Sequence, residues 1–437
     1  MHWPTRRTYA TVAAGALVVA LAACALLWAH RPQQARADDP IKVGVLHSLT
    51  GSVAIAERPI NDATLLAIDE LNQQGGLLGR RVQPVIVDGR SDWPAFGAGA
   101  ERLLTGDRVS AVFGCYTSAS RKQVVPVFEK HRGVLFYPTF YEGIESSPNV
   151  VYTGAAPNQS SIPGVKWFLE NRGRKVFLVG SDYIYPRATN AVLKAQIAYL
   201  GGKVLGERYV PLGSSDTAGT VRAITVAKPD VVVSTMVGDS NIPFFKELRA
   251  AGITPRTVPV LNLVFGEVEL QSLNARTMAG DYIALNYFQS LDNPANRRFV
   301  AAFKKRYGAH RAIADPMEAA YTSVHLWAQA VREAGSADAE AVLKAVPGQS
   351  YDAPEGQVYV DEHNLHTWKT ARIGQIRPDG QVTVVWASEA LIHPMPYSIF
   401  QTRRHWEDLV SSLHTRWGHS WQAPPPNGPD SPTPKGG

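Results

Sequence analysis

Short apolar segments alternate with helical patterns along most of the chain, and this alternation constrains the fold more than any other feature of the sequence. The segment IKVGVL, which begins at Ile41, is apolar and rich in β-branched residues. The pattern NDATLLAIDELNQQGG follows, in which Leu65, Ile68 and Leu71 recur near the 3.6-residue helical period before two glycines. Strands that alternate with helices form a parallel sheet covered on both faces. The sequence therefore predicts an α/β fold.

The alternation runs in two successive series. The first contains RVQPVIVDG, VSAVFGCY and GVLFYPT, and the second begins near residue 158 and contains KVFLVGSD, DVVVSTMVG and VPVLNLVFG. After residue 350 the helical patterns give way to hairpin patterns, with turn residues in PDG. A chain of 437 residues exceeds what one core usually supports. We expect two similar lobes, each a doubly wound parallel sheet.

Breaks in these patterns predict the domain boundaries. The first lobe is expected at residues 41–155 plus 285–352, and the second at 156–284 plus 353–395. A C-terminal helical extension is expected at 396–422, because Trp406, Leu409, Leu413 and Trp417 recur every three or four residues. This helix either packs on the body of the protein or binds a partner. Residues 423–437 are rich in proline and glycine, so we expect an unfolded tail.

The N-terminal segment 1–37 has the pattern of a leader for export. Arg6 and Arg7 precede a long apolar run, and the small-residue motif ARA ends at Ala37. Three fates remain open: cleavage after Ala37, lipid attachment at Cys24 in the motif LAAC, or an uncleaved membrane anchor. In each case we expect a periplasmic location.

Charge and cysteine content narrow the class of partner. The leader holds four arginines and no acidic residue, so the rest of the chain carries 40 basic and 38 acidic residues. No run of five like charges occurs, and we expect no nucleic-acid partner. Beyond the leader Cys115 is the one cysteine, which excludes an intramolecular disulfide in that part of the chain.

Catalytic and cofactor motifs are absent from the sequence. No strand leads into a GxGxxG or Walker loop, GxSxG does not occur, and Cys115 has no neighbouring histidine in the sequence to activate it. The motif DEHNLH places His363 and His366 beside Asp361 and Glu362, but a polar hairpin turn explains these residues without a metal. We expect neither an enzyme nor a bound cofactor or metal.

Polar and aromatic residues follow several of the predicted strands. Loops at the carboxyl ends of parallel strands meet at one edge of a sheet, where open α/β sheets bind ligands. Serine supplies hydrogen bonds, tyrosines stack on a flat ligand, and a carboxylate accepts N–H groups. The alternatives are that Ser118 or Ser120 and an aspartate cap helices, and that the tyrosines pack at the edge of the core. The candidate ligand-binding residues on this argument are Tyr116, Ser118, Tyr137, Tyr183, Tyr185 and Asp239.

Seven stretches carry a family resemblance in their order along the chain. They are GVLHSLTGSVAIAE, GCYTSASRK, FYPTFYEG, YTGAAPNQ, GSDYIYPR, GDSN and APEGQVYVDEHNLHTWKTARIG. The span from Ile41 to Trp386 resembles the type I periplasmic binding proteins of the branched-chain amino acid-binding family, and within it the branch that binds urea and short-chain amides. The resemblance implies two lobes joined by three crossovers that close on a ligand like a clamshell.

The same resemblance implies roles for particular residues. Ser118 and Thr139 would bond the amide group of the ligand, Asp239 would accept its N–H groups, and the tyrosines would enclose it. The loop around Pro138 is nearer to the amide type than to the urea type, so the choice between urea and a small amide stays open. The residues of this chain that match the cleft of the amide-binding relatives are Tyr116, Ser118, Tyr137, Thr139, Tyr183 and Tyr185.

The expected function is therefore capture of a small amide or urea for an ABC transporter, with the closed lobes docking on permease subunits in the membrane. The alternative is a sensor subunit that passes ligand-induced closure to a receptor, kinase or regulator.

Overall fold

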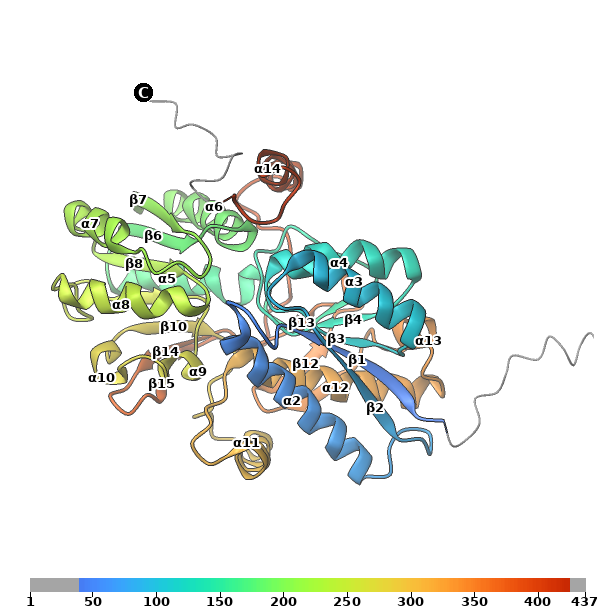
Figure 1. Cartoon of the computed structure of the whole chain (residues 1–437). Coiled ribbons are helices and arrows are strands. Elements are labelled where there is room, and N and C mark those ends of the chain that lie inside the picture. The colour runs from blue at the N-terminus through green and yellow to red at the C-terminus, as the bar shows by residue number, and fades with distance from the viewer. Residues whose placement is uncertain (1–38, 425–437) are drawn as a thin grey trace, which may run out of the picture. The chain divides into compact units, whose positions relative to one another are not determined.

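The computed structural model describes residues 39–424 and shows an α/β protein built on two large sheets, with a third sheet of three short strands between residues 350 and 368. The predicted fold class is confirmed (Figure 1). The expected leader, including Cys24 and Ala37, lies outside the described residues, as does the tail from residue 425. Within residues 39–424, the chain contains no helix that is both long and apolar enough to cross a membrane.

The first sheet has five parallel strands in the order β2-β1-β3-β4-β5. Figure 1 shows α3 and α4 above these strands and α2 and α12 below them. Three of the strands are buried along their whole length, as a parallel sheet covered on both faces requires. The bounds are β1 Ile41–His47, β2 Val82–Asp88, β3 Val112–Gly114, β4 Leu135–Tyr137, β5 Val150–Tyr152, α2 Ala54–Gln73, α3 Trp93–Arg102, α4 Ser118–His131 and α12 Asp315–Ala334, with a π-helical turn at Leu103–Asp107.

The second sheet has seven strands in the order β15-β14-β10-β9-β8-β6-β7. Its strands are parallel except that β14 runs antiparallel to both of its neighbours. Helices α5 and α6 pack together on this sheet, and α7 and α8 form a second pair. The bounds are β6 Lys175–Ser181, β7 Lys203–Val210, β8 Val231–Thr235, β9 Val260–Asn262, β10 Tyr282–Leu285, β14 Arg372–Ile376, β15 Val382–Ala387, α5 Ser161–Asn171, α6 Ile184–Tyr199, α7 Ala218–Ala227 and α8 Asn241–Ala250.

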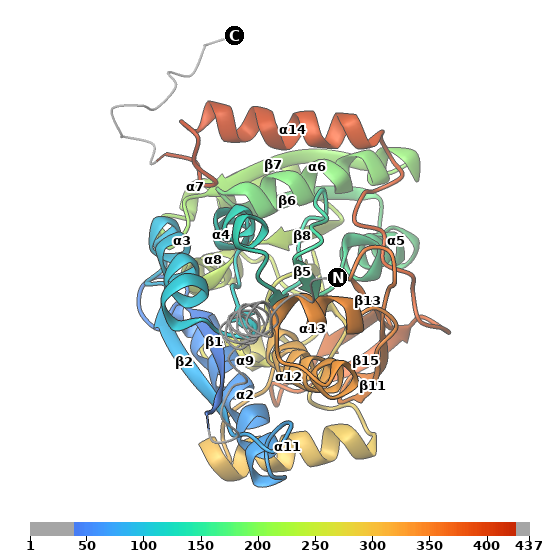
Figure 2. The same cartoon turned by 90° about the vertical axis from the view of Figure 1, so that its right-hand side faces the viewer.

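Smaller elements complete the two lobes and the C-terminal end. We call the five-stranded sheet with its helices the first lobe and the seven-stranded sheet with its helices the second lobe; the residue boundaries predicted for the lobes stay a prediction. Helix α14 lies along α6 of the second lobe (Figure 2). The remaining bounds are α9 Glu267–Leu270, α10 Ala275–Met278, α11 Pro294–Tyr307, α13 Ala339–Ala345, α14 Arg403–Arg416, β11 Ser350–Ala353, β12 Gly356–Val360 and β13 Thr367–Trp368, with 3₁₀ turns at Pro157–Gln159 and Gly238–Ser240.

The chain passes between the two sheets three times, and one buried side chain ties the three passages together. Asn286 follows β10, and its amide nitrogen donates to the carbonyl oxygens of Gln159 at 3.0 Å and of Thr370 at 2.8 Å. The Gln159 amide in turn donates to the carbonyl oxygen of Thr367 at 2.9 Å. These bonds satisfy backbone groups that buried irregular segments would otherwise leave unpaired. They make a defined hinge between the lobes.

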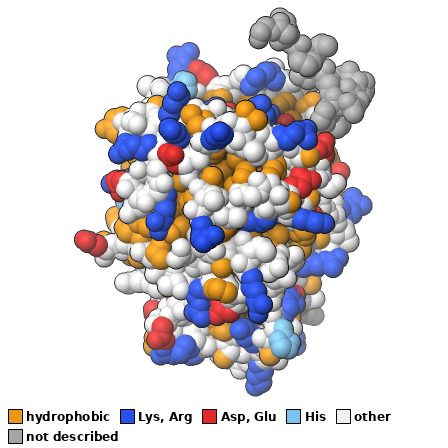
Figure 3. Space-filling view, turned by 90° about the vertical axis from the view of Figure 1, so that its left-hand side faces the viewer, with side chains coloured by type: hydrophobic (Ala, Val, Ile, Leu, Met, Phe, Trp, Pro, Cys, Tyr) orange, Lys and Arg blue, Asp and Glu red, His pale blue; other side chains and the backbone are white. Residues whose placement is uncertain are grey.

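The face drawn in Figure 3 carries lysine and arginine side chains scattered among hydrophobic, polar and acidic ones. The basic side chains do not gather into one continuous patch on this face. A polybasic surface would be the electrostatic signature of nucleic-acid binding. The part of the surface in Figure 3 has no such signature.

Candidate ligand-binding site

The end of β3 turns sharply and presents the first residues of the site. At Gly114 an added Cβ would lie 2.3 Å from the carbonyl oxygen of Leu46, so only glycine permits this close approach of two strands. The next residue, Cys115, has a φ of +65°, which is uncommon for a residue other than glycine. Thr117 then caps α4, since its hydroxyl accepts from the backbone N–H of Ser120 at 3.1 Å.

The alternative reading of this loop, in which Ser118 or Ser120 caps the helix, is therefore wrong. Thr117 occupies that position, and Ser118 is the first residue of α4. Its side chain is buried and has a different set of partners.

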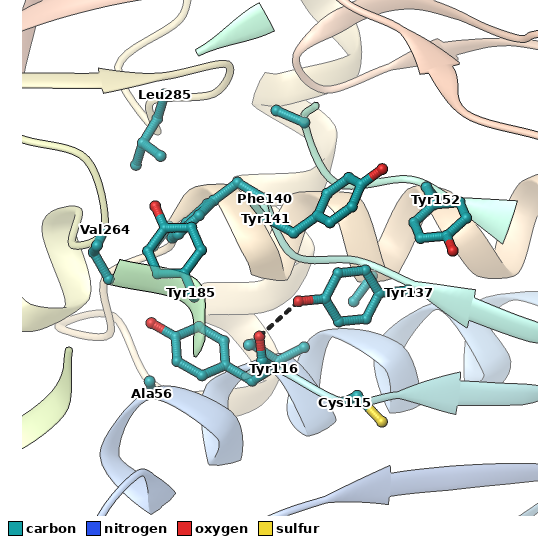
Figure 4. Packing of buried hydrophobic residues seen from close by; sticks show 14 of the residues in the cluster. Ala56, Cys115, Tyr116, Tyr137, Phe140, Tyr141, Tyr152, Tyr185, Val264 and Leu285 are labelled. Carbon is teal, nitrogen blue, oxygen red and sulfur yellow. Dashed lines mark hydrogen bonds between the residues drawn. The ribbon is translucent and has the colours of Figure 1, made fainter. Parts of the chain in front are cut away.

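Five of the seven candidate residues line one cavity where the two lobes face each other. The cavity contains about 190 Å³ of empty space. Figure 4 shows the rings of Tyr116, Phe140 and Tyr185 gathered beside Val264. The first lobe contributes hydroxyl and aromatic side chains, and the second contributes tyrosines and valines. The lining residues are Tyr116, Ser118, Thr139, Phe140, Tyr183, Tyr185, Val237 and Val264.

The other two candidates lie elsewhere. Tyr137 is fully buried at the end of β4, and its hydroxyl donates to the carbonyl oxygen of Tyr116 at 2.9 Å, as the dashed line in Figure 4 marks. It supports the wall and does not line the cavity. Asp239 is exposed in the 3₁₀ turn at Gly238–Ser240 and is not among the lining residues. The structure thus does not bring Asp239 to the cavity.

The hydroxyl of Ser118 both donates and accepts a hydrogen bond within the protein. Its hydroxyl donates to a carboxylate oxygen of Glu142, and Nη1 of Arg121 donates to the Ser118 oxygen at 3.1 Å. A serine hydroxyl has one proton and two acceptor lone pairs. Toward the cavity, Ser118 is consequently left with an acceptor.

Four buried charges behind Ser118 form a closed cluster. Arg121 donates to Glu142 at 3.0 Å and to Glu145 at 2.7 Å, and Lys122 lies 2.9 Å from Glu145. Burial alone would raise the pKa of Glu145, but Arg121 and Lys122 outweigh it and lower the pKa to about 2. Two cations and two anions cancel, so the cluster fixes the position of Ser118 without presenting a free charge to the cavity.

Thr139 differs from Ser118 because its hydroxyl has no assigned partner. The side chain is 2% exposed, and its Oγ1 has no hydrogen-bond partner among the described residues. A buried hydroxyl without a partner costs about 1–3 kcal/mol. Native proteins keep such groups rarely, and a ligand that bonds Thr139 would remove the cost.

A second cavity, with about 270 Å³ of empty space, lies on the other side of Tyr116 and Val264. Its walls are mainly aliphatic, with Ala314 and Met317 among them, but Glu269 also lines it. Burial raises the pKa of Glu269 to about 7, so a large part of this carboxyl is neutral near neutral pH.

Neither Cys115 nor the histidine motif forms a reactive site. Cys115 is fully buried, and burial followed by the nearby Glu57 raises the pKa of its thiol, which keeps it protonated. His366 stacks on Tyr152 with ring centroids 4.1 Å apart, and burial lowers its pKa to about 4. His363 is exposed, and the described residues contain no group of three or more side chains arranged to hold a metal.

Sequence reasoning missed part of the site. Phe140, Val237 and Val264 line the cavity although no polar signal marks them, and Glu142 and Arg121 position Ser118 from behind. One signal was available for Phe140 and Glu142, because both lie in the quoted stretch FYPTFYEG directly after Thr139.

Comparison with known proteins identifies the family. The family model for the periplasmic binding protein domain matches residues 41–403. A Leu/Ile/Val-binding protein of Rhizobium johnstonii is 25% identical over 368 residues, which cover 76% of this chain and 93% of that protein. A Leu/Ile/Val-binding protein homologue of Brucella abortus is 22% identical and covers 82% of this chain and 93% of that protein. A limonene hydroxylase of Geobacillus stearothermophilus is 36% identical over 124 residues, but the match spans only 23% of that protein.

Solved structures share the fold over nearly their whole length. A solute-binding protein of an ABC transporter from Rhodopseudomonas palustris, in complex with 3,4-dihydroxybenzoic acid, has a TM-score of 0.74 at 22% identity and covers 82% of this chain and 99% of that one. The branched-chain amino acid transporter substrate-binding protein of Streptococcus pneumoniae, in complex with isoleucine, has a TM-score of 0.69 at 21% identity and covers 82% of this chain and 100% of that one. Since the family model covers most of the chain, the chain belongs to the periplasmic binding proteins, and its relatives place it among the type I solute-binding proteins of the branched-chain amino acid-binding family.

Proposed function

We propose that this protein captures urea or a short-chain aliphatic amide by closure of its two lobes and delivers it to the permease of an ABC transporter. The export leader expected at residues 1–37 would place it in the periplasm. The family and the fold support a binding role, and the cavity supports the choice of ligand.

The observation that carries the proposal is that no charged side chain lines the cavity. A carboxylate ligand, such as an amino acid or a hydroxybenzoate, needs a cation or several N–H donors to replace the water it loses. The nearest buried cations, Arg121 and Lys122, are already paired with Glu142 and Glu145. A carboxylate would enter without a cation to pair with, whereas an uncharged amide needs none.

The hydrogen-bonding groups of the wall match a primary amide. Ser118 presents an acceptor, which suits a ligand N–H, because its own proton is committed to Glu142. Thr139 has its hydroxyl free to donate to a carbonyl oxygen. Tyr183 and Tyr185 supply flat faces for a planar ligand. Urea, formamide and acetamide each combine a carbonyl oxygen with an NH₂ group on a planar frame.

The size of the cavity also favours a ligand of few atoms. The volume open to the centre of a water-sized molecule is about 10 Å³, far below the roughly 300–1,000 Å³ of typical small-molecule pockets. The wall must move apart slightly to admit urea or acetamide, and much further to admit the side chain of a branched amino acid together with its charged ends.

Uptake in the source organism tests the proposed role. We expect deletion of the gene to abolish uptake of labelled acetamide and urea at micromolar supply, and expression of the full chain to restore it. A strain in which Thr139→Val replaces the wild type should recover uptake only partly. Normal uptake in the deletion strain, combined with loss of amide-induced transcription, would instead favour the sensor alternative.

A further inference from the structure

The chain continues past the matched family domain and returns to the junction of the lobes, next to the cavity residue Tyr183. The family match ends at residue 403, where α14 begins. After α14 the segment from Trp417 to Ala423 runs back toward the junction of the lobes; we call it the C-terminal strap. The strap contacts both lobes, one through backbone hydrogen bonds and the other through side chains.

The strap is joined to the second lobe through its backbone. The N–H of Ile184 donates to the carbonyl oxygen of Trp421 at 3.0 Å, and the N–H of Ala423 donates to that of Asp182 at 3.1 Å. These two bonds make an antiparallel bridge between Gln422 and Tyr183, which is one of the tyrosines lining the cavity. The strap therefore holds the backbone of a cavity residue and moves with the second lobe.

Side chains alone join the strap to the first lobe. The indole N–H of Trp93, at the start of α3, donates to Oε1 of Gln422 at 3.0 Å. The ammonium of Lys122 on α4 lies 5.3 Å from the centre of the Trp421 ring. Both contacts span the junction between the lobes, so opening the lobes must break them.

Helix α14 keeps the strap in register. It packs on α6, and Trp406 is buried with its indole N–H donating to the carbonyl oxygen of Ser398 at 2.8 Å. His414 near the end of the helix stacks on Trp421 with ring centroids 4.0 Å apart. The ring of Trp421 thus lies between His414 of α14 and the ammonium group of Lys122 on the first lobe.

We propose that Gln422 and Trp421 are positioning residues for ligand binding, which hold Tyr183 in the cavity wall and latch the two lobes in the closed state. The inference rests on the proposed function only for the identity of the ligand, acetamide or urea. The latch slows release of the bound molecule, because dissociation requires the Trp93–Gln422 bond to break first.

A double-mutant cycle across the lobe junction tests the latch. Trp93→Phe removes the indole N–H but keeps an aromatic ring, and Gln422→Ala leaves the strap's backbone bonds in place. Dyes at Lys130→Cys and Val226→Cys, whose side chains are 66% and 82% exposed on the two lobes, report closure by single-molecule energy transfer. The fully buried Cys115 is left unchanged. Asp408→Asn, on the exposed side of α14, is the matched control.

We expect either single variant to reduce the closed fraction and to raise the dissociation rate of acetamide or urea about fivefold, with little change in the association rate. The double variant should be no worse than either single one, because both break the same bond. Unchanged closure and dissociation in all three variants would overturn the latch even where both ligands bind. Reduced closure in a protein that binds neither ligand would support the latch and contradict the proposed ligand.

Discussion

The two walls of the cavity are built in different ways. The first-lobe wall carries Ser118 and Thr139 and is backed by a buried ion-pair cluster around Arg121. The second-lobe wall carries Tyr183 and Tyr185 and is backed at Tyr183 by backbone pairing with the C-terminal strap. On one side charged groups orient the hydroxyl of Ser118, and on the other the C-terminal strap holds the backbone of Tyr183.

The first-lobe wall shows that buried charges close to a cavity need not make the cavity itself charged. Four formal charges lie close behind the first-lobe wall, yet they are satisfied by one another. Replacing such a cluster by apolar residues can be neutral, whereas removing one member leaves an unpaired buried charge. The cluster therefore serves as a rigid mount for Ser118, and the cavity in front of it stays uncharged.

The largest expected effect on stability comes from disrupting the ion-pair cluster behind the first-lobe wall. Arg121→Met leaves Glu142 without its closest cation and weakens the pairing of Glu145, so the free energy of unfolding should fall by about 3–5 kcal/mol. Guanidinium chloride titration measures this without urea, which is a candidate ligand. Arg297→Met, at a pair whose side chains are 61% and 86% exposed, is the control and should cost less than about 1 kcal/mol. Equal losses in the two variants would contradict the account of the cluster.

Removing a ring from the second-lobe wall should have the next largest effect. Tyr183→Ala deletes a stacking surface of the wall while the backbone bridge to the strap stays in place, so acetamide binding should weaken by about 2–4 kcal/mol. Tyr199→Ala, at the far end of the adjacent helix α6 and 78% exposed, should bind normally. Calorimetry on both variants separates loss of the wall from general damage to the lobe. Normal binding by Tyr183→Ala would remove the second-lobe wall from the site.

The two hydroxyls of the first-lobe wall should respond differently to their removal. Ser118→Ala and Thr139→Val should each weaken binding by about 1–2 kcal/mol. Only Ser118→Ala should also lower the free energy of unfolding, because Arg121 and Glu142 lose a partner. Thr139→Val removes a hydroxyl that has no protein partner, so the free energy of unfolding of this variant should be unchanged or slightly higher. A stability loss in Thr139→Val equal to that in Ser118→Ala would mean that both hydroxyls are structural.

The smallest effect is expected at the cysteine beneath the first-lobe wall. The thiol of Cys115 is fully buried, and its raised pKa keeps it protonated, so Cys115→Ala should leave acetamide affinity within about twofold of the wild type. Chemical turnover of any ligand that disappears in this variant would show a catalytic role and contradict the assignment as a binding protein.

Much of the fold was predictable from the sequence because strand and helix patterns are local. The apolar run at β3, the turn after it and the helical pattern of α4 are all visible within a short stretch of chain. The positions of Tyr116 and Tyr185 were predictable in the same way, since strand direction brings their loops to the ligand-facing edge of each sheet, whereas Thr139 was predicted from the family resemblance.

The features that were missed depend on where a side chain points or on hydrogen-bond partners far away in the sequence. Asp239 follows a strand as predicted, but the 3₁₀ turn at Gly238–Ser240 leaves it exposed, and no local pattern specifies that turn. The partner of Ser118 is a carboxylate 24 residues away, and many acidic residues in the sequence compete for that role. The bridge from Gln422 to Tyr183 joins segments with no sequence signal in common.

Calorimetric titration of the wild-type protein with acetamide and urea, in parallel with isoleucine and 4-hydroxybenzoate, tests the central claim that the cavity accepts only uncharged ligands. We expect one tight site for acetamide or urea and no measurable binding of the two carboxylates. Tight binding of either carboxylate, with none of the uncharged ligands, would show that a cation reaches the cavity and would contradict the account.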